Sequence, residues 1–314
     1  MSIDVSVVVP VYNSEQTIAL LVDGVHRVLS AAGKTFEMIL VDDCSNDTSW
    51  RAIQAIAATR ANVTGMHLRR NYGQHNALLA GIRAARGDVI VTIDDDLQHP
   101  PEEIPNLLAQ LDAGWDVVYG FPRKLPHSAT RNIFSWFTKV ALQKAMGEET
   151  ARHASAFRAF RTSLREAFRD YSSAYVAIDV LLTWGTRSFD WIYVEHRPRQ
   201  FGTSNYTVKT LATHALTMIT GFSTLPLRIA SVAGLFFTLF GGVLLLYVIG
   251  RYMLLGTTLP GFPFLASAIS IFAGAQLCAL GIMGEYLARM HVRTLGRPPY
   301  LVGGTTAPHA DERP

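Results

Sequence analysis

The sequence predicts an α/β protein with a doubly wound, mostly parallel sheet, followed by two transmembrane helices. Short apolar runs alternate with amphipathic helical patterns through residues 5–119, which is typical of βαβ units. Polar turns follow three of these runs, where open α/β sheets bind their ligands. Beyond residue 225 the chain contains two long stretches without a charged residue.

The composition is apolar, and the excess of apolar residues lies after residue 225. The chain has 314 residues, of which 49% are hydrophobic and 17% charged, and its net charge is +3. That charge is too small to indicate a nucleic-acid partner. Cys44 and Cys278 fall in different parts of the chain, so no disulfide framework is expected and a reducing cytosolic setting is indicated. No secretory signal is visible at the start.

The expected strands and helices follow from apolar periodicity and from the polar residues between them. Asn13 or Ser14 is expected to cap the first helix, and residues 46–49 the second. The expected strands are residues 5–9, 36–41, 63–68, 88–93 and 116–119. The expected helices are residues 16–31, 49–59, 74–86 and 101–111.

An acidic turn after the fourth strand is the most informative feature. Side chains alternate along a strand, so Asp94 and Asp96 are expected to point the same way at its carboxyl end. Two such carboxylates repel each other unless a cation lies between them, and Mg²⁺ or Mn²⁺ prefers oxygen ligands. Gln98 can add a carbonyl oxygen, and a metal so placed commonly also holds a substrate diphosphate. The alternative is an acidic surface turn without a ligand.

Two further polar turns are expected at the same edge of the sheet, at residues 10–14 and 42–43. Neither contains G-x-G-x-x-G, and no G-x-x-x-x-G-K follows a strand, so dinucleotide and P-loop sites are weakly supported. Asp43 can accept hydrogen bonds from a uracil and a ribose, or it can cap the helix that follows.

Residues 128–146 and 207–222 form amphipathic patterns within the expected cytoplasmic domain of residues 1–225. Such helices usually face a protein core, but these carry aromatic and basic residues or lead into a membrane span. We therefore interpret both as interfacial helices.

Residues 229–250 and 259–284 carry no charge and are each long enough to cross about 30 Å of hydrocarbon. Residues 226–288 are accordingly assigned to two transmembrane helices. The flanking arginines predict that both termini are cytoplasmic, and the tail of residues 289–314 is expected to be disordered from Gly303 onward. These arginines are Arg228, Arg289, Arg293 and Arg297.

Taken together, the motifs resemble glycosyltransferase family 2 enzymes with the GT-A fold. The first three are V-P-V-Y-N at residues 9–13, V-D-D-C-S at 41–45 and D-D-D at 94–96. The resemblance narrows to polyisoprenyl-phosphate glycosyltransferases of the dolichol-phosphate mannose synthase type through D-L-Q-H-P-P-E at 96–102 and R-Q-F-G-T-S-N-Y at 199–206. N-Y-G-Q-H at 71–75 and G-E-Y at 284–286 are most similar to bacterial undecaprenyl-phosphate sugar transferases.

This resemblance implies transfer of a sugar from a nucleotide-sugar, favoured as a UDP-sugar, to undecaprenyl phosphate at the bacterial inner membrane. Because a phosphate acceptor is already mostly ionised at pH 7 and needs no general base, we expect the transfer to be inverting. The resemblance also implies roles for individual residues. The residues implied to bind the nucleotide-sugar are Pro10, Tyr12, Asp43, Asp94, Asp95 and Ser204. The implied ligands of Mg²⁺ or Mn²⁺ are Asp94, Asp96 and Gln98, and the implied catalytic residues are Asp96, Arg131 and Arg199.

Three positions depart from the family pattern. Ser14 separates Asn13 from Glu15, Cys44 stands where glycine is common, and Asn205 stands where lysine is usual.

Two other functions are compatible with parts of the sequence. A processive polysaccharide synthase would carry Q-x-x-R-W and a longer membrane channel, and neither is visible. A catalytically inert, membrane-tethered nucleotide-binding partner of a lipid flippase would not need Asp94, Asp96 and Arg199. The sequence leaves the oligomeric state open, a homo-oligomer included.

Overall fold

The structure is a computed structural model that describes residues 2–123, 153–173, 176–198, 225–255 and 261–306. The chain divides into two compact units. The first unit comprises Met1–Val208 together with Gly296–Pro314, and the second comprises Lys209–Leu295.

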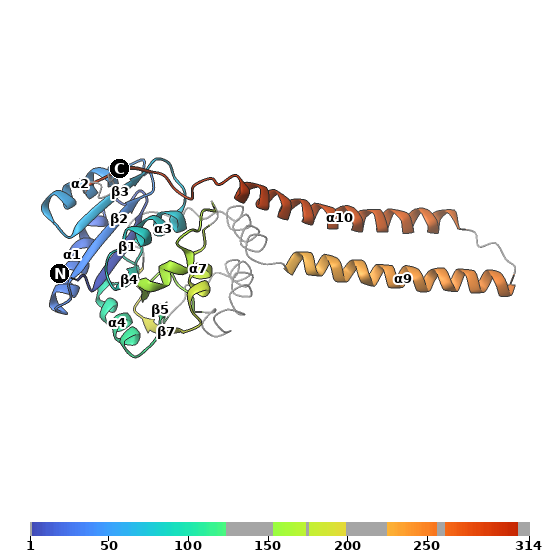
Figure 1. The fold of residues 1–314 in the computed structure, drawn as a ribbon, viewed down its shortest axis with the longest axis horizontal. Coiled ribbons are helices and arrows are strands. Elements are labelled where there is room, and N and C mark those ends of the chain that lie inside the picture. Colours follow the sequence, from blue (N-terminus) through green and yellow to red (C-terminus); the bar gives the residue numbers. More distant parts are fainter. Residues whose placement is uncertain (1, 124–152, 174–175, 199–224, 256–260, 307–314) are drawn as a thin grey trace. The chain divides into compact units, whose positions relative to one another are not determined.

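The first unit is built on an eight-stranded sheet with the order β7-β5-β6-β4-β1-β2-β3-β8 (Figure 1). Strands β1 to β5 and β7 run in one direction, whereas β6 and β8 are antiparallel to their neighbours. The mostly parallel α/β sheet expected from the sequence is confirmed. The strands are β1 Val5–Val11, β2 Phe36–Asp42, β3 Val63–Leu68, β4 Val89–Thr92, β5 Val117–Pro122, β6 Arg158–Arg161, β7 Phe189–Val194 and β8 Val302–Thr305.

Helices cover both faces of this sheet (Figure 1). Side chains of α3 and α7 join one buried cluster, and those of α1 and α4 join the other. The strands between them are buried on both faces, which explains why β1 and β2 are nearly continuous apolar runs. The helices of this unit are α1 Ile18–Ala31, α2 Ser49–Thr59, α3 Gln74–Ala84, η1 Pro101–Glu103, α4 Ile104–Asp112, η2 Thr162–Phe168 and α7 Ile178–Gly185.

Pro10 lies inside β1, and because proline has no backbone N–H it would normally interrupt the hydrogen-bond ladder between strands. The pairing of β1 with β4 ends at Val8 and Thr92, two residues before Pro10, while pairing with β2 continues to Val11. One side of β1 is therefore released from the sheet at Pro10, and the chain can turn towards the loops at the carboxyl ends of the strands.

The C-terminal tail differs from the expectation. Residues 302–305 form β8, which pairs antiparallel with β3, so the predicted disorder from Gly303 is wrong for the described part of the tail. Val-Gly-Gly-Thr has weak strand propensity, and its conformation is imposed by the exposed edge of β3 rather than by its own sequence.

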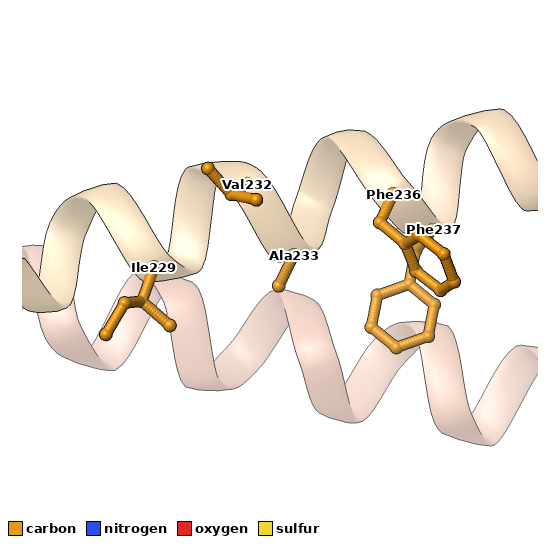
Figure 2. A pocket seen from close by; sticks show the side chains of 5 residues that line it. All are labelled: Ile229, Val232, Ala233, Phe236 and Phe237. Carbon is orange, nitrogen blue, oxygen red and sulfur yellow. The ribbon is translucent and has the colours of Figure 1, made fainter.

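The second unit contains α9 Leu225–Leu255 and α10 Phe262–Thr294. The two helices contact each other, for example through the rings of Phe237 and Phe272, whose centroids are 6.0 Å apart. Figure 2 shows an apolar hollow along α9, which is lined by Ile229, Val232, Ala233, Phe236 and Phe237.

The two predicted membrane spans are not confirmed. Among the residues that the structure describes, no helix is both long and apolar enough to cross a membrane. The predicted amphipathic helices at residues 128–146 and 207–222 lie outside the described residues. Both cysteines are free, in agreement with the absence of a disulfide framework.

Candidate functional site

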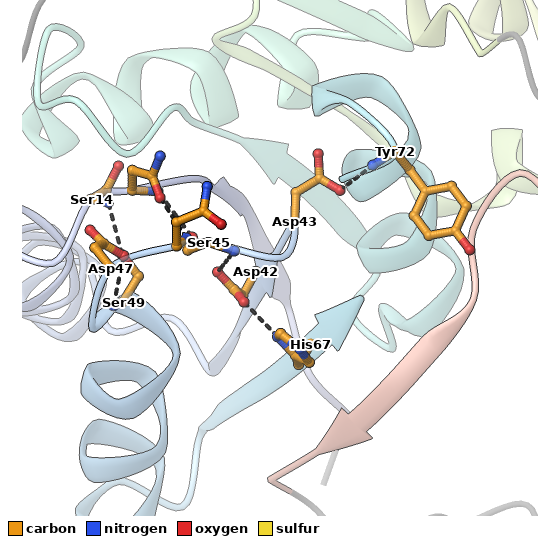
Figure 3. A network of polar contacts seen from close by, with 10 residues as sticks. Ser14, Asp42, Asp43, Ser45, Asp47, Ser49, His67 and Tyr72 are labelled. Atoms are coloured by element: carbon orange, nitrogen blue, oxygen red, sulfur yellow. Dashed lines mark hydrogen bonds and ion pairs between the residues drawn. The ribbon is translucent and has the colours of Figure 1, made fainter. Parts of the chain in front are cut away.

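The turns after β1 and β2 are joined by backbone-to-side-chain hydrogen bonds at the carboxyl edge of the sheet (Figure 3). The Asn13 N–H donates to Ser45 Oγ at 2.9 Å, and the Asn46 N–H donates to Asn13 Oδ1 at 2.8 Å. The Ser14 N–H donates to Ser49 Oγ at 2.8 Å. Since these bonds join the turn after β1 to the turn after β2 and to the first residue of α2, the two turns hold one defined arrangement.

Glu15 has a structural role in this network. Its carboxylate accepts hydrogen bonds from the N–H of Thr48, at 3.1 Å, and from the Thr48 hydroxyl. Thr48 is the N-cap residue of α2 and makes no side-chain cap of its own. For α1 the expected cap is incorrect, because Thr17 occupies the N-cap position and makes no side-chain cap bond. For α2 the expected local cap is supplemented by Glu15, which comes from another turn.

Asp43 fixes the loop after β3. Its two carboxylate oxygens accept the N–H groups of Tyr72 and Gly73, each at 2.7 Å, and the residue is only 3% exposed. Gly73 has φ +93, a conformation that side chains rarely adopt. Burial raises the pKa of Asp43, while the two N–H donors oppose the rise. Asp43 therefore organises the loop, and each oxygen keeps a second lone pair for a ligand.

The acidic turn is connected to two of these loops. The Tyr12 N–H donates to Asp95 Oδ2 at 3.1 Å, and Gln74 Nε2 donates to Asp94 Oδ1 at 2.7 Å. The Gln98 N–H donates to Asp96 Oδ1 at 3.1 Å. The loops after β1, β2, β3 and β4 thus contribute to one polar site.

The expectation that Asp94 and Asp96 point the same way because side chains alternate along a strand is wrong. β4 ends at Thr92, so both aspartates lie in the turn beyond the strand, where side chains no longer alternate. Their carboxylates nevertheless lie close enough to interact, and Leu97, in the same turn, has φ +59.

Negative charge is concentrated in this turn. Burial raises the pKa of Asp94 to about 7, and the neighbouring carboxylates of Asp96 and Asp95 add to the rise. Arg158 and the hydrogen bond from Gln74 act in the opposite direction. Burial also raises the pKa of Asp95 to about 6, against hydrogen bonds from Ser14 and Tyr12. A cation bound here would stabilise the ionised carboxylates.

The turns after β1, β2 and β4 each contain a residue with a strained backbone conformation. Within the described residues, the non-glycine residues with positive φ are Asn13 at 55°, Cys44 at 58° and Leu97 at 59°. They follow β1, β2 and β4, respectively. Such conformations are costly for residues other than glycine and cluster at functional sites.

We expect Cys44→Gly to raise the free energy of unfolding by about 0.5–1 kcal/mol, because glycine adopts this φ without the steric cost that cysteine incurs. Denaturant unfolding of the purified variant measures the change, with Ala32→Gly, at a position of φ −78, as the control that should lose stability. A loss of stability in both variants would contradict the strain assigned to Cys44.

A buried cation lies behind the acidic turn, and the sequence motifs did not predict it. Arg158, on β6, is 1% exposed and forms an ion pair with Asp179 at the start of α7. Arg158 Nε also donates to Thr92 Oγ1 at 3.2 Å, and Tyr119 donates its hydroxyl to Asp179 Oδ1 at 3.0 Å. No motif signals Arg158, because it occupies a four-residue strand that starts and ends with arginine.

The structure brings together most of the predicted site residues. Pro10 lies near the end of β1, and Tyr12 and Asp43 lie on the turns after β1 and β2. The other four, Asp94, Asp95, Asp96 and Gln98, lie together in the acidic turn. Arg131, Arg199 and Ser204 lie outside the described residues. Gln74, which contacts Asp94 directly, belongs to the N-Y-G-Q-H motif but was not predicted as a site residue.

The donor chemistry of the acidic turn fits a hard divalent cation. Carboxylate and amide oxygens are the ligands that Mg²⁺ and Mn²⁺ prefer, and Mg²⁺ usually takes few from protein and the rest from phosphate and water. The described residues contain no cluster of three or more His, Cys, Asp or Glu side chains arranged as a metal cage. Asp94, Asp96 and Gln98 would supply three oxygen ligands, which fits a metal that takes its other ligands from phosphate and water.

The sheet with joined turns at its carboxyl edge defines the chain as an α/β protein of the GT-A type. A solved structure with this fold is the glucosyl-3-phosphoglycerate synthase of Mycobacterium tuberculosis, in complex with Mn²⁺, UDP and glucosyl-3-phosphoglycerate. The TM-score is 0.53 at 22% sequence identity, over 69% of this chain and 77% of that one. At this identity the likeness concerns the fold alone.

Sequence comparison then defines the family. Residues 6–171 match the profile of glycosyl transferase family 2. An undecaprenyl-phosphate 4-deoxy-4-formamido-L-arabinose transferase of Pectobacterium atrosepticum is 34% identical over 97% of this chain and 94% of its own length. The enzyme of the same name from Shewanella sediminis is 36% identical over 95% of this chain and 91% of its own. The chain belongs to glycosyl transferase family 2, as the resemblance predicted.

Proposed function

We propose that the protein transfers a sugar from a UDP-sugar to undecaprenyl phosphate at the cytoplasmic face of the bacterial inner membrane. The observation that carries this proposal is the convergence of the turns holding Tyr12, Asp43 and Asp94–Asp96 at one edge of the sheet. Relatives 34–36% identical over nearly the whole chain are named for transfer to undecaprenyl phosphate. Their sugar, 4-deoxy-4-formamido-L-arabinose, is the first donor to test.

In this proposal Asp94, Asp96 and Gln98 hold Mg²⁺ or Mn²⁺, and Pro10, Tyr12, Asp43 and Asp95 line the nucleotide site. The metal would neutralise charge on the leaving diphosphate. The glucosyl-3-phosphoglycerate synthase with Mn²⁺ and UDP supports the compatibility of the fold with such a pair of ligands.

The acceptor's chemistry determines what else the protein must supply. A phosphate monoester has a second pKa near 6, so it is mostly dianionic at pH 7 and needs no general base. The protein has to bring this anion and the anionic donor to opposite sides of one anomeric carbon. We assign Arg131, Arg199 and Ser204 to the phosphates and expect direct displacement with inversion.

The membrane location is also part of the proposal. Residues 229–250 and 259–284 contain no charged residue, and large apolar side chains of α9 are exposed, with Leu235 at 62% and Leu246 at 71%. An exposed apolar surface of this extent marks a site of contact with a protein or a membrane, and we propose that it contacts the bilayer. Residues 302–305 belong to the same sheet as β1, so an even number of spans is required between them.

Impermeant thiol reagents can test this topology. In a variant with Cys44→Gly and Cys278→Ala, a cysteine at Gly256 should be labelled from outside intact cells, whereas a cysteine at Ala307 should be labelled only after permeabilisation. Labelling of Ala307→Cys from outside, with Gly256→Cys protected, would refute the cytoplasmic orientation of the catalytic domain.

The test of the function is a screen of the purified, detergent-solubilised protein with undecaprenyl phosphate and several UDP- and GDP-sugars. We expect one monosaccharide per lipid phosphate, with the anomeric configuration inverted in the NMR spectrum of the product. Polymeric products would indicate a processive synthase. Nucleotide binding without turnover of any donor would favour an inert binding partner, and a product with the donor's configuration would overturn direct displacement.

A further inference from the structure

We propose that β8, the strand that follows the second apolar helix, positions the donor-binding loop and is required for sugar transfer. The inference rests on the proposed function, because the loop that β8 holds contacts Asp43 and Asp94. It assigns a catalytic requirement to a segment that is distant in sequence from every motif of the site. It also distinguishes this segment from a tail that merely follows the helices.

The contacts of β8 with β3 are extensive for a short strand. Met66 pairs with Thr305, His67 with Gly304 and Leu68 with Val302. The pairing continues at both ends, where the Arg69 N–H donates to the Leu301 carbonyl at 2.9 Å and the Thr306 N–H donates to the Gly65 carbonyl at 3.0 Å. Without β8, β3 would be an edge strand with a row of unpaired backbone groups.

The pairing is reinforced by side chains. The Gly65 N–H donates to Thr306 Oγ1 at 2.8 Å. A Cβ added to Gly65 would lie 2.4 Å from Ile53 and 3.0 Å from Thr306, so β3, α2 and the residue after β8 pack too closely for a larger residue. Pro299 is buried, and Tyr300 packs against one of the two core clusters, with the Arg83 guanidinium 5.8 Å from its ring centroid.

From β8 a short path leads into the site. Arg69, held by Leu301, begins the loop that ends at Gln74. Within that loop, the N–H groups of Tyr72 and Gly73 bind Asp43, and Gln74 binds Asp94. The short loop of residues 69–73, together with Gln74 at the start of α3, therefore connects the C-terminal strand to the two carboxylates of the donor site.

A second path runs through His67. This residue pairs with Gly304, and its Nδ1 lies 2.6 Å from Asp42 Oδ2 in a hydrogen bond (Figure 3). Asp42 immediately precedes Asp43 and also accepts the Ser45 N–H at 3.3 Å. Trp50 covers the His67 ring, with centroids 5.1 Å apart. Displacement of β8 would disturb the turn after β2 through this path as well.

The alternative is that β8 only covers an edge and adds stability. Steady-state kinetics separates the two cases. A purely structural strand would lower the fraction of active enzyme, so kcat would fall while both KM values stayed constant. A positioning strand acts on the donor side, so KM for the nucleotide-sugar should rise about tenfold or more while KM for undecaprenyl phosphate changes less than about twofold.

The main variant ends the chain after Gly296, and the matched control ends it after Thr306. We expect the first to lose donor affinity and rate, and the second to behave as the full chain. A synthetic peptide of residues 297–306, R-P-P-Y-L-V-G-G-T-T, should restore both parameters by adding a strand to β3. Full activity of the shorter chain without peptide would overturn the proposal.

A second form of the experiment avoids failure of folding. A specific protease site inserted after Gly296 allows β8 to be cut from an enzyme that has already folded, and then removed in mild denaturant. Hydrogen exchange at the amides of Tyr72 and Gly73 reports on the loop without any need for turnover. We expect protection of these amides to fall about tenfold or more after removal of β8 and to return with the peptide.

The two proposals can fail independently. If the intact enzyme transfers no sugar, the proposed function is wrong, whereas unchanged exchange at Tyr72 and Gly73 after removal of β8 refutes the positioning role. Unchanged exchange together with reduced turnover would also refute it, since the loss would then arise elsewhere.

Discussion

Asp96→Asn is expected to lower the rate of sugar transfer by about 100-fold or more, because it removes a charged metal ligand while leaving the fold intact. The Asp96 carboxylate accepts the N–H of Gln98, and an amide oxygen can accept the same hydrogen bond. Asparagine also removes one of the two negative charges that raise the pKa of Asp94. The change should therefore not destabilise the turn.

The measurement combines turnover with Mn²⁺ binding. We expect Asp96→Asn to bind Mn²⁺ plus UDP at least about tenfold more weakly than the wild type, because one anionic ligand is lost. Asp112→Asn, at an exposed position at the end of α4, is the control and should match the wild type in both assays. Wild-type turnover by Asp96→Asn in the presence of excess EDTA would exclude the metal role.

The first five strands could be predicted because their sequences carry the pattern of their environment. Val5–Val11 and Phe36–Asp42 are buried on both faces, and each is followed by polar residues at the same edge of the sheet. The same regularity indicated which turns converge, so the pattern alone placed Tyr12, Asp43 and the acidic turn together. Alternating strands and helices indicate that the strands run parallel. The turns at their carboxyl ends therefore lie at the same edge of the sheet.

Strands β6 and β8 could not be predicted, since tertiary contacts impose their conformation. β6 is a four-residue strand that inserts antiparallel between β4 and β5, and its core contact is a buried arginine. β8 contains two glycines and becomes a strand only against β3. Both contribute to the site, β6 through Arg158 and β8 through the loop after β3. The sequence therefore predicted which turns come together better than which residues hold those turns in place.

The connections within the site were also invisible to local patterns. Glu15 caps α2 through Thr48, a residue 33 positions further along the chain. Asp43 was expected to contact a nucleoside or cap its own helix, yet it binds the loop before α3. Such roles depend on which turns become neighbours. A carboxylate at a strand end can cap a helix, bind a neighbouring loop or bind a ligand, so its position in the sequence does not distinguish these roles.

The largest stability effect is expected for Asp179→Ala. Asp179 pairs with Arg158, which is 1% exposed, and it also accepts the hydroxyl of the fully buried Tyr119. Alanine leaves the Arg158 guanidinium buried without its counter-ion. Breaking a buried pair in this way costs about 3–5 kcal/mol, because the remaining charge keeps its desolvation penalty.

A double variant identifies the origin of this loss. Replacing both partners, as in Arg158→Met with Asp179→Leu, removes the unpaired charge, and we expect the double variant to unfold at higher denaturant concentration than Asp179→Ala. Exposed Asp170→Ala is the matched control and should change stability by less than about 0.5 kcal/mol. A double variant as unstable as Asp179→Ala would mean that packing, rather than charge, limits stability here.

The same double variant shows why a buried ion pair is present at all. Hydrophobic replacements of buried pairs are often tolerated by the fold, so stability alone does not require Arg158 at this position. Arg158 also opposes the rise in the pKa of Asp94 and bonds Thr92, the last residue of β4 before the acidic turn. We therefore expect the double variant to fold but to transfer sugar more slowly than the wild type. Wild-type turnover in a stable double variant would mean that the Arg158–Asp179 pair serves only the protein core and not sugar transfer.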